Sequence, residues 1–369
     1  MKFSVVIAAY NVENYIGSLL QCLLGQTYSD FEVIVVDDCA TDGTAKLVDE
    51  FADEFASKSI PYQVIHKPVN EGLSMARNTG LESAKGEYVL FWDGDDLVED
   101  NALEVIAGAL DGRTVDFIVY GYTEDYYKGD EVSYRVEKSP GNYFAKPLVH
   151  AFPYITKLEQ QTMFGYAWNK VFRREFLVEH NLRYETITHV EDILFNLQVA
   201  ERMESMLCIE DNLYHYINRG QERLTSKYLP EYFDLQKKRF RAFLALQNQK
   251  IQWAKETNQP ISQEEIATWQ QQVMETMAAA YFRTFQSAIT REINHGTSKK
   301  DILAMAEREQ NEPLYQQLRD HLNTESKMAK TLYAPLANGD FAKAYSRGKL
   351  ICFVQKHFAG LFAKLKQHR

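Results

Sequence analysis

Short apolar segments alternate with helical patterns over the first hundred residues, and this alternation constrains the fold most strongly. Strands that are short, apolar and separated by helices imply right-handed crossovers and a mainly parallel sheet. We therefore predict an α/β fold for this part of the chain. The predicted strands are residues 5–9, 32–36, 62–66 and 88–92, and the predicted helices are residues 14–24, 45–55 and 73–84.

Polar residues directly follow three of these strands. Tyr10 and Asn11 come after the first strand, Asp37 and Asp38 end the second, and residues 93–96 follow the fourth. In open α/β sheets, ligands bind beyond the carboxyl ends of the strands. We therefore expect the three polar clusters to converge on one edge of the sheet and to form the functional site.

Three carboxylates and one glycine stand together at Asp93-Gly94-Asp95-Asp96, after the apolar strand Tyr88 to Trp92. Crowded carboxylates repel one another unless a cation lies among them. Hard divalent ions such as Mg²⁺ or Mn²⁺ prefer oxygen ligands and commonly hold substrate phosphates as well. A solvated acidic turn is the alternative for such a motif in isolation, but the neighbouring polar clusters favour the metal.

Composition excludes several classes of protein. At 369 residues the chain is long enough for two domains, and its formal net charge of -10 argues against a general nucleic-acid binder. No run of 18 apolar residues and no signal-peptide pattern occurs, so we expect an intracellular protein without a membrane-spanning helix. The cysteines are too widely spaced to indicate a disulfide framework or a zinc site; they are Cys22, Cys39, Cys208 and Cys352.

The character of the sequence changes at about residue 230. Before that point we predict a strand at residues 115–122, a hairpin or loop through residue 143, helices at 168–177 and 191–203, and strands within 205–216. After it, strand signals vanish and helical periodicity persists, with breaks near residues 259–260, 295–296 and 338–339. We therefore predict one domain at 1–230, with residues 1–100 and 101–230 as its halves, and a helical domain at 231–369.

A nucleotide-sugar pocket would account for the polar clusters together. Asp38 could accept the imide hydrogen of uracil while Tyr10 lies over the base. Arg77 could brace the acidic cluster and the diphosphate that it neutralises. Taken alone, Asp37 and Asp38 could instead cap the next helix, and Arg77 could be an ordinary arginine on a helix surface.

Four ordered motifs within residues 1–225 resemble those of family 2 glycosyltransferases. Three positions depart from the family pattern: Ala8 replaces proline, Cys39-Ala40 replaces Gly-Ser, and Gly94 replaces serine, which would give the sugar more room. The motifs are Ile7-Ala8-Ala9-Tyr10-Asn11, Asp37-Asp38-Cys39-Ala40-Thr41-Asp42-Gly43-Thr44, residues 70–78 with Asn70, Gly72, Ala76, Arg77 and Asn78, and Asp93-Gly94-Asp95-Asp96.

The resemblance implies an inverting enzyme with the GT-A fold, in which a Rossmann-like half binds a nucleotide-diphosphate sugar. It implies that Asp95 is the principal ligand of Mn²⁺ or Mg²⁺ and that Asp93 lies beside it and contacts the ribose or the donor sugar. Asp96 has no assigned role. The implied contacts to the nucleotide sugar are Ala8, Tyr10, Asp38, Asn70, Arg77, Trp92, Asp93 and Gly94.

On the acceptor side, Glu191-Asp192 resembles the family's Glu-Asp pair at a helix start. We assign Asp192 as the general base and Glu191 as its orienting or acceptor-binding neighbour; the alternative is that both favour the positive helix end. Trp168 is predicted to stack on an acceptor sugar, with a core tryptophan as the alternative. Residues 215–226 resemble the segment that closes over the diphosphate.

The last thirty residues, 340–369, carry seven Lys and Arg residues against one Asp, with apolar residues at helical spacing. This pattern is typical of a helix that lies on an anionic membrane surface, or of one that packs on its own protein or a second subunit.

We predict a metal-dependent inverting glycosyltransferase that moves a sugar from a UDP-sugar to a glycan, lipid-linked or polyol-phosphate acceptor in cell-surface polysaccharide synthesis. It would be cytoplasmic or peripheral on the inner face of the plasma membrane. The alternatives are a polyprenyl-phosphate sugar synthase and a non-catalytic carbohydrate-binding or assembly subunit of the same fold.

Overall fold

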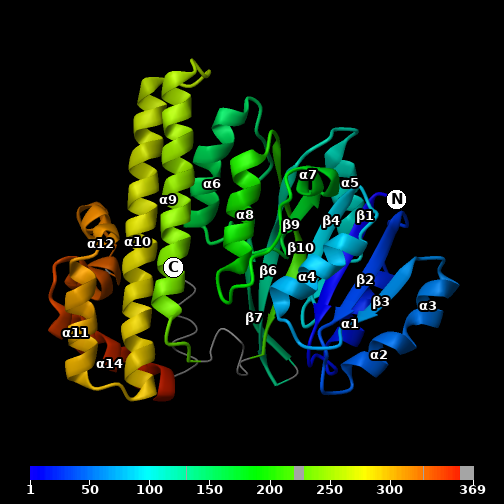
Figure 1. Ribbon diagram of the computed structural model, residues 1–369, viewed down its shortest axis with the longest axis horizontal. Coiled ribbons are helices and arrows are strands. Elements are labelled where there is room, and N and C mark those ends of the chain that lie inside the picture. Colours follow the sequence, from blue (N-terminus) through cyan, green and yellow to red (C-terminus); the bar gives the residue numbers. More distant parts are fainter. Residues whose placement is uncertain (130, 220–227, 327, 358–369) are drawn as a thin grey trace. The chain divides into compact units, whose positions relative to one another are not determined.

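The computed structural model describes residues 1–129, 131–219, 228–326 and 328–357. The chain divides into two compact units, Met1–Gln221 and Glu222–Arg369. The first unit contains a sheet with helices packed against it, and the described part of the second unit is helical (Figure 1).

In the described residues of the first unit, ten strands form one sheet in the order β3-β2-β1-β4-β9-β6-β10-β5, with β7 against β6 and β8 against β10. The first four strands in this order are parallel to one another, as predicted. β9 joins β4 and β6 in the antiparallel direction, and β6 and β10 are again parallel. The sheet as a whole is therefore mixed, because β9, which follows β4 in the sheet order, is antiparallel to both of its neighbours.

The strands are β1 (Phe3–Ala9), β2 (Phe31–Asp37), β3 (Tyr62–His66), β4 (Tyr88–Asp93), β5 (Leu97–Val98), β6 (Phe117–Lys128), β7 (Glu131–Lys138), β8 (Tyr143–Phe144), β9 (Lys170–Arg173) and β10 (Met206–Asn218). The helices of the first unit are α1 (Ile16–Leu24), α2 (Thr44–Glu50), α3 (Ala52–Ser57), α4 (Leu73–Ser83), α5 (Ala102–Leu110), α6 (Ala151–Gln160), α7 (Arg174–Glu179) and α8 (Glu191–Arg202). Those of the second unit are α9 (Tyr232–Glu256), α10 (Gln263–His295), α11 (Lys299–Gln310), α12 (Pro313–Leu318), α13 (Ala334–Ala337) and α14 (Phe341–His357).

The predicted alternation of strands and helices in residues 1–100 is confirmed, and so is the hairpin, formed by β6 and β7. The helix predicted over residues 168–177 is wrong. Its first half is β9, which pairs with β4 and β6, and α7 begins only at Arg174. Short apolar runs do not distinguish a buried strand from a helix by periodicity alone, and here pairing inside the sheet decides the conformation. Helices α5 and α6 are not among the predicted elements.

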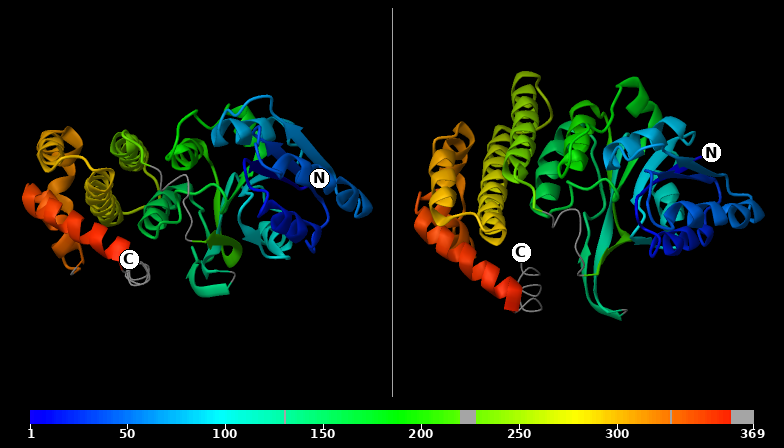
Figure 2. Two further views of the ribbon diagram at one scale, coloured as in Figure 1. Left: turned by 90° about the horizontal axis from the view of Figure 1, so that it is seen from below. Right: turned by 60° about the horizontal axis from the view of Figure 1, so that its bottom comes forward.

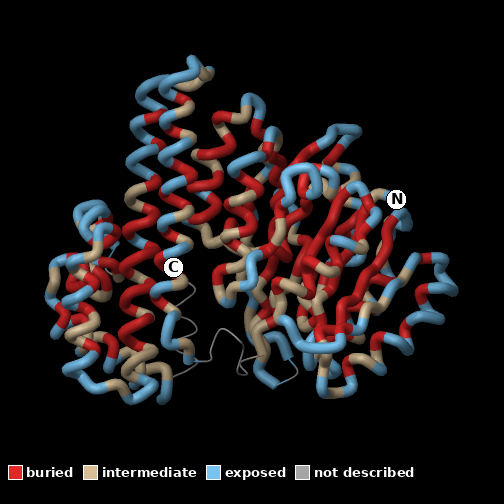
Figure 3. The backbone as a smooth tube through the Cα atoms, viewed as in Figure 1, coloured by how far each residue is buried: buried red, intermediate tan, exposed pale blue. Residues whose placement is uncertain are grey.

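The core of the first unit lies along β1, β2 and β4, which are almost continuously buried (Figure 3). Helix α4 packs against β1 and β2. The contact is close at Gly80, where an added Cβ would lie 2.2 Å from Cγ1 of Val6. The missing side chain therefore sets how closely α4 approaches the sheet, and α4 carries Arg77.

The second unit is built on two long helices, α9 and α10, that pack along each other (Figure 2). Helix α10 begins with a capping box between Ser262 and Glu265 and ends at Gly296, whose φ of 92° favours glycine. A buried ion pair joins Lys237 to Glu309 at 2.7 Å, and Tyr281 donates to the same carboxylate. Among the helices of the described residues, none has an apolar stretch sufficient to cross a bilayer.

Helix α14 begins the predicted basic amphipathic segment. It packs on α10, since an added Cβ at its Gly348 would lie 2.8 Å from Cδ1 of Ile293. Leu350 and Phe353 are exposed on the same helix. This part of the segment thus both packs on its own unit and presents apolar side chains to solvent. The remaining residues of the prediction, 358–369, lie outside the described part of the chain.

Gly80→Ala is expected to lower the free energy of unfolding by about 1–3 kcal/mol, because the new methyl group collides with Val6. Gly108→Ala is the matched control, since an added Cβ there meets nothing within 4 Å in the last turn of α5. The control is expected to gain about 0.5–1 kcal/mol from helix propensity. Urea unfolding of both variants measures the difference, and equal gains would contradict the packing argument.

Candidate active site

The three predicted polar clusters lie at one edge of the sheet. In the parallel register, Ala9 of β1 pairs with Asp37 of β2, and Ala8 pairs with Asp93 of β4. The backbone N–H of Asp38 donates to the carbonyl oxygen of Ala9 at 2.9 Å, which continues the pairing past the strand ends. The predicted convergence is confirmed.

Asp38 is buried and organises the approach to α4. Its two carboxylate oxygens accept the backbone N–H groups of Glu71 at 3.1 Å and Gly72 at 2.7 Å, and Lys67 forms an ion pair with it at 3.3 Å. Gly72 has a φ of 89°, a conformation that favours glycine, directly before the helix. Asp38 therefore fixes the turn that starts α4. Its contact to uracil stays a prediction, as do those of half-buried Ala8 and exposed Asn70.

Tyr10 is 45% exposed at the end of β1. The neighbouring Asn11 accepts the backbone N–H of Thr41 at 2.8 Å, which ties the chain after β1 to the loop after β2. A ring in this place is accessible to a planar base, and the proposed contact is compatible with its exposure.

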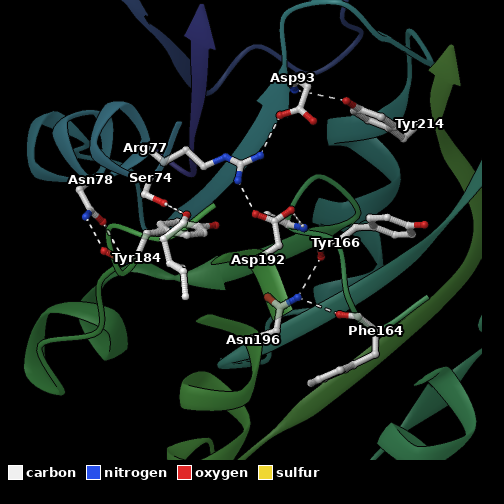
Figure 4. A network of polar contacts seen from close by, with 12 residues as sticks. Ser74, Arg77, Asn78, Asp93, Phe164, Tyr166, Tyr184, Asp192, Asn196 and Tyr214 are labelled. Atoms are coloured by element: carbon white, nitrogen blue, oxygen red, sulfur yellow. Dashed lines mark hydrogen bonds and ion pairs between the residues drawn. The ribbon is translucent and has the colours of Figure 1, made fainter. Parts of the chain in front are cut away.

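Arg77 is the centre of the site, where it lies only 2% exposed (Figure 4). One guanidinium nitrogen donates to Asp93 at 2.8 Å and another donates to Asp192, so a single cation joins β4 to the start of α8. The guanidinium also lies over the ring of Tyr184 at 5.4 Å. Burial alone would lower the pKa of Arg77, but Asp192 and Asp93 raise it above its usual range. Arg77 is therefore no helix-surface arginine.

Asp192 and Glu191 open α8 and have different surroundings. One oxygen of Asp192 receives Arg77, and the other accepts the backbone N–H of Ala167 at 3.0 Å. Glu191 is largely buried, and its Oε2 has no hydrogen-bond partner among the described residues. Burial, followed by the charge of Asp192, raises the pKa of Glu191 to about 7. The pair thus combines a tethered carboxylate with one that titrates near neutrality.

Asp96, which the sequence left without a role, anchors the acidic turn to β10. Its carboxylate accepts the hydroxyl of Tyr214 at 2.8 Å and the backbone N–H of Ile217 at 2.7 Å. The Tyr214 hydroxyl in turn accepts the backbone N–H of Asp93 at 3.2 Å. Burial, with Asp95 and Asp93 nearby, raises the pKa of Asp96 well above its ordinary range. Asp96 therefore holds the turn in place.

Arg219 follows β10 and reaches the same turn. Its guanidinium donates to the backbone carbonyl of Asp95 at 2.7 Å and lies 4.1 Å from the ring centre of Tyr15. The predicted closing segment at 215–226 is described only up to this residue, and its remainder lies outside the described part of the chain. The part that is described brings a cation beside the acidic turn.

The acidic turn is suited to a divalent cation that is shared with a ligand. Burial is the main cause that raises the pKa of Asp93 to about 6, and Asp95 adds to it while Arg77 opposes it. Within the described ranges, no group of three or more His, Cys, Asp or Glu side chains is placed to hold a metal ion. Mg²⁺ and Mn²⁺ are commonly held by one or two carboxylates plus substrate phosphates. Asp95 and Asp93 fit such a site.

Two predicted contacts require correction because their side chains are buried. Trp92 is 1% exposed, and its indole N–H donates to the hydroxyl of Tyr120 at 2.9 Å, so it supports the site from behind and does not face a ligand. Trp168 is 3% exposed and stacks on the rings of Tyr166 and Tyr214, each at 4.6 Å. The structure therefore favours the core alternative for Trp168 over a stack on an acceptor sugar.

Gly94 also differs from expectation. An added Cβ would lie 3.4 Å from Val12 and 3.5 Å from Ile16, at ordinary contact distance. The missing side chain thus faces α1 and the loop before it, and it does not enlarge the space for a sugar.

Sequence reasoning missed the residues that connect these elements. Tyr184 lies under Arg77 and is fixed by Asn78, whose side chain makes two hydrogen bonds of 2.9 Å with the Tyr184 backbone (Figure 4). Tyr214 joins Asp93 to Asp96 from a strand more than a hundred residues later. Asn78 stands in a quoted motif, but no local pattern marks the two tyrosines.

Comparison with known proteins places the chain in a family. The profile described as glycosyl transferase family 2 matches residues 4–180. The uncharacterized glycosyltransferase EpsJ of Bacillus subtilis (strain 168) is 31% identical over 255 residues, which cover 66% of this chain and 69% of EpsJ. The putative glycosyltransferase EpsH of the same organism is 31% identical over 217 residues, 58% of this chain and 60% of EpsH. The chain belongs to glycosyl transferase family 2.

The fold is similar to that of a solved structure. TarS of S. aureus, residues 1–349, in complex with UDP-GlcNAc has a TM-score of 0.62 at 20% identity, and the match covers 95% of this chain and 91% of that one. In sequence, the poly(ribitol-phosphate) beta-N-acetylglucosaminyltransferase TarS of Staphylococcus aureus (strain Mu50 / ATCC 700699) is 29% identical over 239 residues, 63% of this chain but only 39% of TarS. The predicted GT-A fold, with a helical C-terminal region, is confirmed.

Glu191→Gln is expected to change the pH dependence of stability. The pKa of Glu191 is raised in the folded protein, so folding favours its protonated form, and this contribution is lost as the pH rises through about 7. The variant should therefore gain stability relative to the parent protein between about pH 5.5 and about pH 8.5.

Urea unfolding at the two pH values measures this difference. Glu82→Gln, on the exposed side of α4, is the control and should show no such gain. An equal pH response of the two variants would contradict the assigned environment of Glu191.

Proposed function

We propose that the chain is a metal-dependent inverting glycosyltransferase, which moves a sugar from a UDP-sugar to a hydroxyl of a glycan or polyol-phosphate acceptor in cell-surface polysaccharide synthesis. The observation that carries this proposal is the bridge by Arg77 between Asp93 and Asp192. It places a carboxylate of the donor edge and a carboxylate of α8 on two sides of one guanidinium. An inverting transfer needs the leaving group and the base on opposite faces of the sugar, and carboxylates on the donor and acceptor sides of one cation are compatible with that requirement.

The donor half would bind the nucleotide along the strand ends. Tyr10 is exposed at the end of β1, the strand that also carries Ala8, and Asp38 follows β2 beside it. Asn70 is exposed in the segment before α4. Asp95 and Asp93 would hold Mn²⁺ or Mg²⁺ against the diphosphate, where such an ion neutralises charge on the departing nucleotide. Arg219 adds a fixed positive charge at the carbonyl of Asp95.

The acceptor half would supply the base. Asp192 accepts the proton of the acceptor hydroxyl, the hydroxyl oxygen bonds to the anomeric carbon, and the bond from that carbon to the diphosphate breaks as UDP leaves. Arg77 and the Ala167 N–H hold both Asp192 oxygens, so the carboxylate stays oriented while the proton arrives. Glu191 would bind or orient the acceptor beside it. The poly(ribitol-phosphate) transferases among the relatives motivate the polyol-phosphate acceptor in this proposal.

A screen of UDP-sugars for Mn²⁺-dependent UDP release, with and without acceptors, tests the proposal. Polyprenyl phosphate is included as an acceptor, and transfer to it alone would favour a lipid-phosphate sugar synthase. If none of the UDP-sugars is turned over, the proposed function is contradicted. If a UDP-sugar binds but is not turned over, a carbohydrate-binding subunit is favoured.

Asp192→Asn is expected to lower turnover by about 10²–10⁴-fold, because the base is lost, and to leave UDP and Mn²⁺ binding intact. Asp95→Asn is its counterpart, since it should abolish the dependence of UDP affinity on Mn²⁺. Isothermal titration with UDP and Mn²⁺, together with initial rates, separates the two variants. Normal transfer by Asp192→Asn would show that Asp192 is not the general base. Unchanged Mn²⁺ dependence in Asp95→Asn would show that Asp95 is not the metal ligand.

We also propose that α14 brings the enzyme to an anionic membrane surface, where lipid-linked acceptors lie. Leu350 and Phe353 are exposed on this helix among Arg347, Lys349 and Lys356. The double variant Leu350→Ser and Phe353→Ser should float less with vesicles that contain anionic lipid. Equal flotation of the variant and the parent chain would instead favour a second subunit as the partner of this surface.

A further inference from the structure

The loop at residues 163–168 lies in the connection from α6 to β9 and contacts the proposed base directly. The backbone N–H of its residue Ala167 donates to Oδ2 of Asp192 at 3.0 Å, while Arg77 binds Oδ1. Both oxygens are therefore held by other groups, and the orientation of the carboxylate depends on where this loop places one N–H.

The loop is held by buried side-chain donors. The side-chain amide of Asn196 donates to the carbonyl of Phe164 at 2.8 Å and to that of Tyr166 at 3.0 Å (Figure 4). The ammonium of Lys170 donates to the carbonyl of Met163 at 2.8 Å. Three carbonyls of one short loop thus receive donors from side chains that are themselves fully buried. Such bonds, made away from water, restrict the loop strongly.

Asn196 lies four residues after Asp192 on α8, so both side chains project from the same face of the helix. Asp192 accepts the backbone N–H of residue 167 of the loop, and Asn196 donates to the carbonyls of residues 164 and 166, the second of which directly precedes residue 167. One face of α8 therefore forms hydrogen bonds with the loop at residues 164, 166 and 167. Movement of the loop relative to α8 would change the contact to Asp192.

The side-chain amide of Asn196 lowers the stability of the fold through its carbonyl oxygen. Its Oδ1 is buried and has no hydrogen-bond partner among the described residues. A buried polar atom without a partner lowers stability, because it has lost its hydrogen bonds to water and gained none in return. The amide cannot be reversed without turning Oδ1 toward two carbonyl oxygens, so the two donated bonds fix its orientation. An orphaned oxygen at a position that contacts the loop beside the base points to a role other than stability.

We propose that Asn196 is a positioning residue for Asp192: it fixes the Phe164 and Tyr166 carbonyls so that the Ala167 N–H meets the base. This inference rests on the proposed function, in which Asp192 accepts the acceptor proton. Arg77 orients the Asp192 carboxylate from the donor side, and the loop that Asn196 holds orients it from the acceptor side. The two hydrogen bonds that Asn196 donates both run to this loop.

Asn196→Ala and Asn196→Asp test the inference, since the first leaves a cavity and the second keeps the shape but removes both donors. Each is expected to lower kcat on the order of 10²-fold, the effect of a misplacement of about 1 Å. The affinity for UDP with Mn²⁺ should stay at the parent value. Lys170→Met removes the 2.8 Å bond to the Met163 carbonyl and leaves only the longer bond of 3.3 Å from the side-chain amide of Asn169, so it should show the same pattern.

Tyr315→Phe is the control for a general loss of stability. Its hydroxyl also donates to buried backbone carbonyls, those of Leu336 and Ala337, but within the second unit. It should lower Tm without the selective loss of kcat.

An unchanged kcat in a folded Asn196 variant would overturn the inference, as would parallel losses of kcat and UDP affinity. If neither Asn196 variant folds, Lys170→Met decides the outcome in the same way. Asp192→Asn, measured in parallel, distinguishes a failure of the proposed function from a failure of the inference about Asn196. Normal transfer by Asp192→Asn defeats the proposed function, whereas its loss alongside normal Asn196 and Lys170 variants defeats only the inference.

Discussion

The site depends on one buried cation. Arg77 lies between Asp93 at the end of β4 and Asp192 at the start of α8, elements that are a hundred residues apart in sequence. Without it, carboxylates of both halves would face one another in a buried place, which is strongly unfavourable. A planar guanidinium can engage both at once, which a lysine cannot do with the same geometry. Gly80 holds α4 against β1, and Asp38 with Gly72 fixes the start of α4, so the fold controls where this cation lies.

The two halves of the site are ordered in different ways. On the donor side, backbone register places the residues, because parallel pairing brings Ala8, Asp37 and Asp93 to one edge. On the acceptor side, side chains do this work, since a loop without regular structure is held by Asn196 and Lys170. The acidic turn is linked to later parts of the chain through Tyr214 and Asp96. Substitutions on the acceptor side should therefore act through orientation more than through binding of the nucleotide.

Much of the donor half could be predicted from sequence, because strand periodicity and the polar residues at strand ends are local signals. The roles of Trp92 and Trp168 could not, since a tryptophan in a motif looks the same whether it faces a ligand or the core. Tyr214 shields Trp168 and also anchors Asp96, and both relations exist only after β10 has entered the sheet. The strand β9 was read as a helix for the same reason, since its conformation is decided by β4 and β6.

The transfer kinetics of Arg77→Lys test the central claim most directly, that one guanidinium unites the donor and acceptor halves into a single inverting site. Lysine keeps the charge but cannot hold Asp93 and Asp192 together. We expect kcat/KM to fall on the order of 10²-fold or more in a variant that stays folded. Transfer by Arg77→Lys at the rate of the parent protein would contradict the central claim.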